Sequence, residues 1–400
     1  MSEHLMDGFP PSPDSQVTLA NWRTAPFNRW AFHHVRELLP TADIPNDPEN
    51  VRNLPVRPAG LEELRIARDT GKALTFNQAL EATSTDGIVV IHRGSIVFER
   101  YFNGMTKHSP HILMSVSKSM LGLVAGILIC NGVLNGSRLV TEVLPELEAT
   151  AWAGATVMHL LDMRTGAAFN EDYSATSGPM IAYRKAVGWN PLGPGERPSD
   201  LRSFFQQLRD TDKPHGGRFW YVSPNTDLLG WVIERASGRR YADLVSELLW
   251  KPVGAAENAY ITVDRLGAPR AAGGMCAATR DLARVGQMLV EGGSHAGRQV
   301  VPSSWIEMIT NDGDPGAWEA GNLASYYPGI PIHYRAKWYV ERRESPLLFC
   351  LGIHGQNLFV DAANEIVIAK FSSQAQPLDI ERIGLTGNLV AALRQALAGS

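Results

Sequence analysis

Cysteine is scarce in this chain, and the sequence has no long run of apolar residues. The three cysteines among 400 residues are widely spaced, so they predict neither a disulfide framework nor a zinc site. The longest apolar stretch, residues 120–130, is too short to cross a bilayer. The first seven residues are acidic and lack the basic and apolar segments of a signal peptide. We therefore expect a cytoplasmic protein without a membrane partner.

The sequence also lacks the charge pattern and the motifs of several function classes. Its formal net charge is −4 and its basic residues are dispersed, so no nucleic-acid partner is expected. It has no Gly-rich phosphate loop and no His-Glu-x-x-His motif. His108 and His111 have the spacing of two helical metal ligands, but Pro110 between them favours an exposed loop. We expect no metal, no cofactor and a small-molecule partner, while the sequence allows a homodimer without specifying one.

Proline is concentrated near the N-terminus. Nine of the 25 prolines fall within residues 10–58, and Trp22 and Trp30 lie among them. Large aromatic residues favour docking over disorder. Residues 1–80 are therefore predicted to form an N-terminal arm packed on the body, whose apolar content of 44% is ample for a core.

Strand patterns occur at both ends of the chain, with helical patterns between them. Residues 87–102 contain two β-rich runs separated by Arg93-Gly94, which predicts a hairpin. Further strands are expected within 338–371, and a closing helix over 383–398. This order predicts an α/β (mixed α+β) fold, with an antiparallel sheet flanked by helices plus a helical domain. The predicted division is an α/β domain of residues 81–139 and 263–400 and a mostly helical domain of residues 140–262, with the site in the cleft between them.

The most informative motif is Ser115-Val116-Ser117-Lys118. A serine and a lysine three residues apart at the start of a helix share one face. A serine hydroxyl is a poor nucleophile, but a desolvated, partly neutral lysine amine can take its proton. Chance alone makes a Ser-x-x-Lys match common. Taken alone, the motif therefore also describes a helix-capping serine followed by an exposed lysine.

A second motif, Tyr221-Val222-Ser223, precedes an apolar helical pattern. A phenol near a lysine can share its proton, and the Lys118 ammonium is expected to lower the pKa of Tyr221. The alternative is a tyrosine packed at a helix start, with Ser223 or Asn225 as the N-cap.

A third motif, residues 350–357, is rich in glycine and leads into a strand pattern. Glycines in a strand mark a bulge or a close approach of backbone. An acyl-transfer site needs a second backbone N–H, beside that of the nucleophile, for the developing oxyanion. The alternative is a plain hairpin turn. His354 either lines the pocket or packs beside the strand.

These three motifs, in this order and at these intervals, resemble those of the penicillin-recognising serine hydrolases. That superfamily includes class C β-lactamases, D-alanyl-D-alanine carboxypeptidases and family VIII esterases. Within it, the chain is most similar to the 6-aminohexanoate-dimer hydrolases. The similarity covers nearly the whole chain from Trp22 onward. It is carried by residues 28–32, 114–119, 170–173 and 352–357.

The resemblance implies a role for several residues. Ser115 would be the acylated nucleophile, Lys118 its base and Tyr221 the proton carrier to the leaving group. The backbone N–H groups of Ser115 and Ile353 would form the oxyanion hole. Tyr173 matches a tyrosine that closes over the substrate. Further substrate contacts are expected from Ser223, Asn225, His354 and Arg184.

Departures from the superfamily pattern narrow the range of substrates that we expect. Ser223 stands where β-lactamases have asparagine and Cys350 where they have lysine, so two groups that hold a β-lactam are missing. Residues 174–189 contain no acid but carry Arg184 and Lys185, which argues against recognition of a free amine. We therefore expect a serine hydrolase that cleaves a linear amide or ester through an acyl-serine.

Other readings of the sequence stay open beside this one. The chain could be a β-lactamase or a D-alanyl-D-alanine peptidase, or a catalytically silent binding relative. A Ser-His-Asp hydrolase is disfavoured because no Gly-x-Ser-x-Gly motif occurs.

Overall fold

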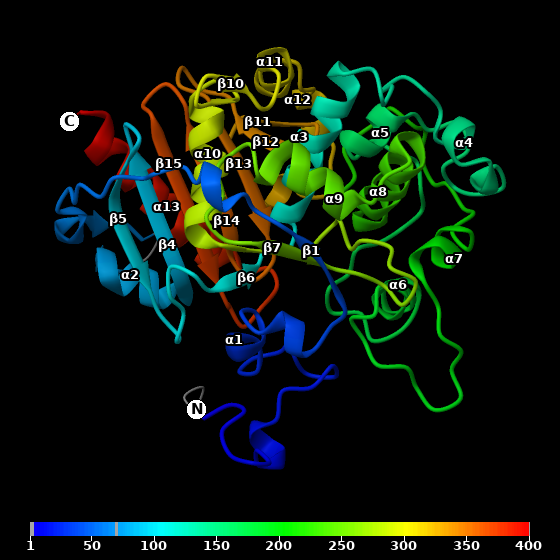
Figure 1. The fold of residues 1–400 in the computed structure, drawn as a ribbon, viewed down its shortest axis with the longest axis horizontal. Helices are drawn as coiled ribbons and strands as arrows, with labels where there is room; N and C mark the ends of the chain where they lie inside the picture. Colours follow the sequence, from blue (N-terminus) through cyan, green and yellow to red (C-terminus); the bar gives the residue numbers. More distant parts are fainter. Residues whose placement is uncertain (1–3, 69–70, 400) are drawn as a thin grey trace.

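A seven-stranded antiparallel sheet combines two strands from the first third of the chain with five from its last quarter (Figure 1). The computed structural model describes residues 4–68 and 71–399. The strand order is β11-β12-β13-β14-β15-β4-β5, so the late strand β15 pairs with the early strand β4, with Val89 opposite Ala369. The strands are β4 (Thr85–His92), β5 (Ser95–Tyr101), β11 (Ile332–Arg335), β12 (Trp338–Glu341), β13 (Leu347–Gly352), β14 (Gln356–Asp361) and β15 (Ile366–Ser372).

The hairpin of β4 and β5 follows from its turn residues. Arg93 and Gly94 have φ values of 47° and 72°, as a two-residue turn matched to the strand twist requires. Side chains alternate across a strand, so Val89 and Val90 belong to two different hydrophobic clusters. Both faces of β4 are therefore covered.

Helices provide that cover. On one face, α3 (Val116–Cys130) packs on β13 and β14, and α10 (Thr279–Val290) packs on β4, β14 and β15. On the other face, α13 (Ile380–Ala398) packs on β15 and on α2 (Phe76–Ala82). The helix that begins directly after Ser115 is thus fixed against the sheet.

Mainly helical segments lie on the right of Figure 1, beside α3. Of these, α8 and α9 contact α3, so the site can be built from both parts of the molecule. The helices of this region are α4 (Val140–Val143), α5 (Val157–Leu161), α6 (Pro179–Ala186), α7 (Leu201–Phe205), α8 (Ser223–Ser237) and α9 (Tyr241–Val245), the last followed by a π-helical turn (Ser246–Trp250). Two more helices, α11 (Ser303–Asn311) and α12 (Pro315–Glu319), precede β11.

A second antiparallel sheet, of order β1-β7-β8-β6, ties the N-terminal arm to the body. Its strands are β1 (Thr41–Ile44), β6 (Pro110–Ile112), β7 (Ala259–Thr262) and β8 (Met275–Ala278). The arm contributes β1 and, before it, helix α1 (Asn28–Ala31). Strand β6 leads directly towards Ser115. Two short pairs, β2 (Arg65–Ile66) with β3 (Leu74–Thr75) and β9 (Ser294–His295) with β10 (Arg298–Gln299), complete the strands.

The predicted fold class is confirmed, as are the hairpin and the closing helix. Strand β1 was not predicted, because Pro40 and Pro45 flank its four residues and mask the pattern. Among the described residues, no helix combines the length and the apolar character needed to cross a membrane.

Candidate active site

Ser115 lies at the N-terminal end of α3, directly after the strained residue Met114, whose φ is 45°. Its hydroxyl makes no capping bond to the helix. Instead, the hydroxyl oxygen accepts a hydrogen bond from Lys118 Nζ at 2.8 Å. Ser115 thus occupies the N-cap position of α3, but its hydroxyl does not cap the helix, and the serine and lysine do meet on one face.

Lys118 is only 2% exposed. Besides contacting Ser115, its Nζ donates to the Ala272 carbonyl oxygen at 2.7 Å. Burial lowers the pKa of Lys118 to about 7, against the opposing effect of the Glu171 carboxylate. A substantial fraction of the amine is then neutral near neutral pH, as a proton acceptor requires.

Tyr221 precedes α8, and its ring centroid lies 4.9 Å from Lys118 Nζ. Its backbone N–H donates to Asn322 Oδ1 at 2.9 Å. This bond ties Tyr221 to the loop before β11, on which Asn322 lies. Burial raises the pKa of Tyr221 well above its ordinary value, although the Ser115 hydroxyl acts in the opposite direction. The expectation of a lowered pKa is wrong, because desolvation and the Glu171 carboxylate outweigh the lowering effects of the Ser115 hydroxyl and the Arg270 guanidinium. Tyr221 is therefore a neutral phenol that can donate and accept a proton.

The turn after β13 carries Ile353 to the same place. Ser115 and Ile353 both line each of two cavities. Gly352 makes this approach feasible, because a Cβ there would lie 2.7 Å from the Leu113 carbonyl oxygen. The Ile353 carbonyl oxygen accepts from Gln356 Nε2 at 3.2 Å, which holds the turn.

Glu171 is a site residue whose role the sequence analysis missed. Its carboxylate accepts from the Ser223 backbone N–H at 2.5 Å, the Ser223 hydroxyl at 2.6 Å and the Tyr173 phenol at 2.7 Å. It also lines both cavities. An acid is thus present beside Ser115, although residues 174–189 contain none. The only available signal was its place in the 170–173 motif.

Arg184 lies behind this segment and lines the smaller cavity. Its guanidinium donates to the Tyr173 carbonyl oxygen at 2.9 Å. Lys185 instead pairs with Glu196 at 2.6 Å and lines neither cavity. Of the two cations, only Arg184 belongs to the site.

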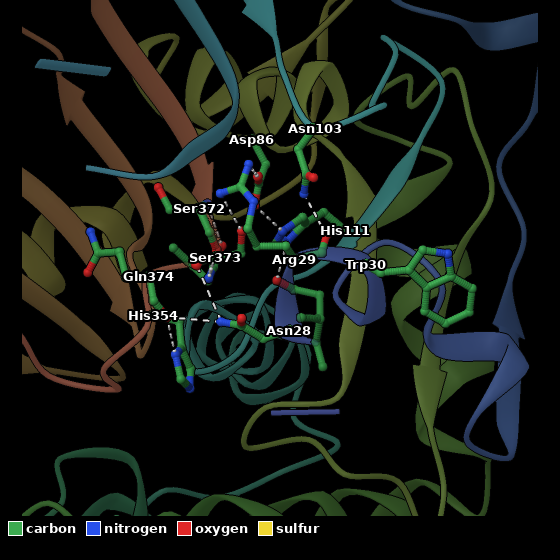
Figure 2. A network of polar contacts seen from close by, with 12 residues as sticks. Asn28, Arg29, Trp30, Asp86, Asn103, His111, His354, Ser372, Ser373 and Gln374 are labelled. Carbon is green, nitrogen blue, oxygen red and sulfur yellow. Dashed lines mark hydrogen bonds and ion pairs between the residues drawn. The ribbon is translucent and has the colours of Figure 1, made fainter. Parts of the chain in front are cut away.

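Two predicted substrate contacts are placed elsewhere by the structure. Asn225 is fully buried, with Oδ1 accepting from Trp152 Nε1 at 2.8 Å, because α8 turns this residue inwards. His354 is also buried, and its Nδ1 donates to the Gln374 carbonyl oxygen at 2.7 Å (Figure 2). Neither residue lines a cavity. His354 therefore packs beside the strand.

The expectation of an exposed loop at 108–111 is wrong for its second histidine. His111 is fully buried in β6, with Nε2 3.3 Å from Asp86 Oδ2, because pairing with β8 draws this strand into the core. His108 is exposed. Within residues 4–68 and 71–399, no group of three metal-ligating side chains is found.

The two cavities differ in size and lining. The larger, about 1030 Å³, contains Ser115, Tyr173 and Tyr221. The smaller, about 30 Å³, lies where Ser223, Arg184 and Arg270 approach Ser115. Ser115 thus stands at the boundary of a large cavity and a small one that is lined by Arg184 and Arg270.

Comparisons with known proteins identify relatives of the chain. The β-lactamase family pattern matches residues 75–392. The 6-aminohexanoate-dimer hydrolase of Paenarthrobacter ureafaciens is 35% identical over 389 residues, covering 97% of this chain and 96% of that protein. The structure of a candidate 6-aminohexanoate-dimer hydrolase from Bacillus anthracis has a TM-score of 0.88 at 29% identity, covering 98% of this chain and 99% of that one.

A more distant structure shows the same fold. The D-stereospecific amidohydrolase of a Streptomyces species has a TM-score of 0.59 at 17% identity, covering 81% of this chain and 98% of that one. The chain belongs to the β-lactamase family. Within that family it is a serine hydrolase, as the resemblance in the sequence predicted.

Proposed function

We propose that the protein hydrolyses a linear amide or ester through an acyl-enzyme formed on Ser115. Neutral Lys118 takes the hydroxyl proton as Ser115 Oγ attacks the carbonyl carbon. The backbone N–H groups of Ser115 and Ile353 stabilise the resulting oxyanion. The proton passes through the Tyr221 phenol to the leaving nitrogen or oxygen, and the C–N or C–O bond breaks. Water then attacks the acyl-serine by the reverse route.

One observation carries this proposal: the 2.8 Å contact between Lys118 Nζ and Ser115 Oγ, made by a buried amine. A binding relative without activity has no need of a desolvated lysine against a serine. The alternative of a catalytically silent protein is therefore disfavoured.

The substrate class rests on the relatives and on the departures from the β-lactamase pattern. The relative from Paenarthrobacter is named for hydrolysis of a 6-aminohexanoate dimer. Cys350 is buried and Ser223 is bound by Glu171, so neither offers a free polar group for a β-lactam. We therefore favour a linear substrate over a β-lactam or a D-alanyl-D-alanine peptide.

A substrate panel tests the proposed function. It contains p-nitrophenyl esters, aminohexanoate oligomers and a chromogenic cephalosporin, with mass spectrometry used to find the acylated peptide. We expect turnover of esters and linear amides and an acyl group on Ser115. Preferred turnover of the cephalosporin would contradict the proposed substrate class.

We also propose that the enzyme works in a reducing compartment such as the cytoplasm. This is supported by the cysteines, since Cys130, Cys276 and Cys350 are all free.

A further inference from the structure

The larger cavity extends well beyond the reacting serine. From Ser115 and Tyr221 it continues over β13 and β14, bounded by α13 and by the loop at 322–332. Its volume of about 1030 Å³ is at the upper end of the usual range for small-molecule sites. The chemistry at Ser115 accounts for only one end of this space.

The middle of the cavity is lined by stacked aromatic rings. Phe349 on β13 faces Phe359 on β14 across the strand pair, with ring centroids 6.0 Å apart. Tyr339 stacks on Phe349 at 5.2 Å. At the far end, Arg394 is paired with Asp361 at 2.6 Å. The lining suits a hydrocarbon chain better than a charged one.

Helix α13 leaves the cavity open on its own side. Gly384, Gly387, Asn388 and Ala391 follow the i, i+3, i+4, i+7 spacing of one helix face, and all four line the cavity. A Cβ added at Gly387 would meet no atom within 4 Å. Gly387 and Ala391 are exposed, so the cavity opens to solvent along this face of the helix.

A buried polar atom also points to an occupant. Asn357, only 6% exposed, lines the cavity opposite Leu351 on the neighbouring strand. Among the residues that the structure describes, its Oδ1 has no hydrogen-bond partner. A buried acceptor without a partner is costly, and because this oxygen is shielded from the cavity, a ligand N–H or O–H group would reach it only after the Asn357 amide turns.

The position of Tyr221 decides which part of the substrate enters the larger cavity. In the proposed mechanism, Tyr221 protonates the leaving atom, so the leaving group must lie on its side of Ser115. Tyr221 lines the larger cavity and not the smaller one. The smaller cavity, with Arg184 and Arg270, remains for the first atoms of the acyl side, because its volume is only about 30 Å³.

We propose that the larger cavity is a leaving-group site for an unbranched aliphatic amine or alcohol. This inference rests on the proposed function and names its substrate class. The six residues of β13 span about 20 Å, enough for roughly a dozen chain carbons. A further N–H or O–H group on the chain would bind Asn357.

Two matched ester series test the assignment. In n-alkyl butanoates the chain grows on the leaving group, whereas in ethyl alkanoates it grows on the acyl group. We expect kcat/KM to rise by about tenfold or more from ethyl to octyl butanoate, and by much less from ethyl butanoate to ethyl octanoate. Equal gains in the two series, or no gain, would overturn the assignment. No turnover of any ester and no label on Ser115 would overturn the proposed function itself.

Substitution of Gly387 tests the same site from the protein side. Gly387→Leu places a side chain at the solvent-exposed edge of the cavity and improves helix propensity, while Gly387→Ala is the small matched control. We expect the octyl-to-ethyl ratio of kcat/KM to fall roughly tenfold with leucine and little with alanine. An unchanged ratio in a Gly387→Leu protein with a normal melting temperature would contradict the proposal.

A different feature, the base of the N-terminal arm, carries a second inference. Asn28, fully buried on α1, donates through Nδ2 to the Gln374 carbonyl oxygen at 3.0 Å and to that of Ser373 at 3.3 Å (Figure 2). The arm is thereby hydrogen-bonded to the segment that follows β15.

The segment after β15 also holds in place the β13–β14 turn that contains Ile353. The Gln374 carbonyl oxygen also accepts from His354 Nδ1, and the Gln374 N–H donates to the His354 carbonyl oxygen at 3.1 Å. The His354 N–H donates to the Pro377 carbonyl oxygen at 2.9 Å. His354 has a φ of 64°, so these contacts maintain an uncommon backbone conformation directly after Ile353.

The arm also contacts the strand that leads to Ser115. The Ile112 N–H at the end of β6 donates to the Phe32 carbonyl oxygen at 2.8 Å. The Phe32 ring packs edge-on against His354, with centroids 5.2 Å apart. One short segment therefore touches the chain on both sides of the oxyanion hole.

We infer that Asn28 is a positioning residue that fixes the spacing between the Ser115 and Ile353 N–H groups. The test compares Asn28→Leu with Asn103→Ala. Asn103 anchors the same arm through the Arg29 carbonyl oxygen at 2.5 Å but does not contact the turn. For Asn28→Leu we expect kcat to fall about tenfold with little change in KM. Affinity for a boronic acid, whose adduct fills the oxyanion hole, should fall in parallel.

A merely structural role would give a different result. Unchanged kcat and boronate affinity in folded Asn28→Leu, or equal losses in Asn103→Ala, would overturn the inference. Melting temperatures of both variants separate loss of stability from loss of positioning.

Discussion

The Lys118 amine lies 2.8 Å from the Ser115 hydroxyl oxygen, and both residues belong to the first turn of one buried helix. The sheet on one side and α8 and α9 on the other hold that turn, so the pair is preorganised before any substrate binds.

The first prediction concerns the nucleophile. Ser115→Ala removes the only atom proposed to carry the acyl group, so turnover and labelling by a fluorophosphonate should both disappear. Peptide mass spectrometry should find the wild-type label on the peptide containing Ser115. Ser137→Ala, at an exposed serine that lines neither cavity, is the control and should keep the label. Substantial turnover by Ser115→Ala would rule out the mechanism.

The second prediction concerns the base. Lys118→Arg keeps a cation but cannot become neutral near pH 7, since a guanidinium stays protonated. We expect the acylation rate, measured by stopped-flow with a p-nitrophenyl ester, to fall by at least ~10²-fold. A near-normal rate would mean that Lys118 acts only as a charge and would make Tyr221 the leading base.

The third prediction concerns pH. Neutral Lys118 is the active form and its pKa is about 7, so kcat/KM should rise as pH increases through 7. The Glu171 carboxylate raises this pKa, so Glu171→Gln should lower it and move the rise to lower pH. Asp172→Asn is the matched control, because Asp172 is exposed and makes no contact with Lys118. A shift to higher pH in Glu171→Gln would contradict the electrostatic role of Glu171.

The fourth prediction concerns the acyl side of the site. Arg184 lines the smaller cavity and should repel a substrate ammonium. Arg184→Asp should therefore raise activity on a linear aminohexanoate dimer relative to its N-acetylated form by up to roughly tenfold, or about 1 kcal/mol. The ratio is measured because the variant also loses the bond to the Tyr173 carbonyl, which affects both substrates. An unchanged ratio would remove Arg184 from substrate recognition.

Local sequence patterns predicted the parts of the site that lie within one element. Ser115 and Lys118 are three residues apart on one helix, so their meeting follows from helix geometry alone. The β4–β5 hairpin likewise follows from Arg93-Gly94 and its flanking runs.

Residues that depend on distant contacts were not predicted. Glu171 acquires its role only because its loop folds back on Ser223, at the start of α8. Asn225 lies two residues after Ser223 on that helix, a rotation of about 200°, and so faces the core. The burial that raises the pKa of Tyr221 comes from residues far away in sequence and cannot be derived from its neighbours.

The pairing of β4 with β15 has a consequence for synthesis on the ribosome. A nascent chain that has emerged as far as α3 already carries Ser115 and Lys118, yet it lacks β13, β14 and β15. Neither the turn bearing Ile353 nor the wall that desolvates Lys118 then exists. Because the partner strands are so distant in sequence, their docking is a late and slow step. We expect the emerging polypeptide to be inert towards acyl substrates and to gain activity only when its last strands join the first.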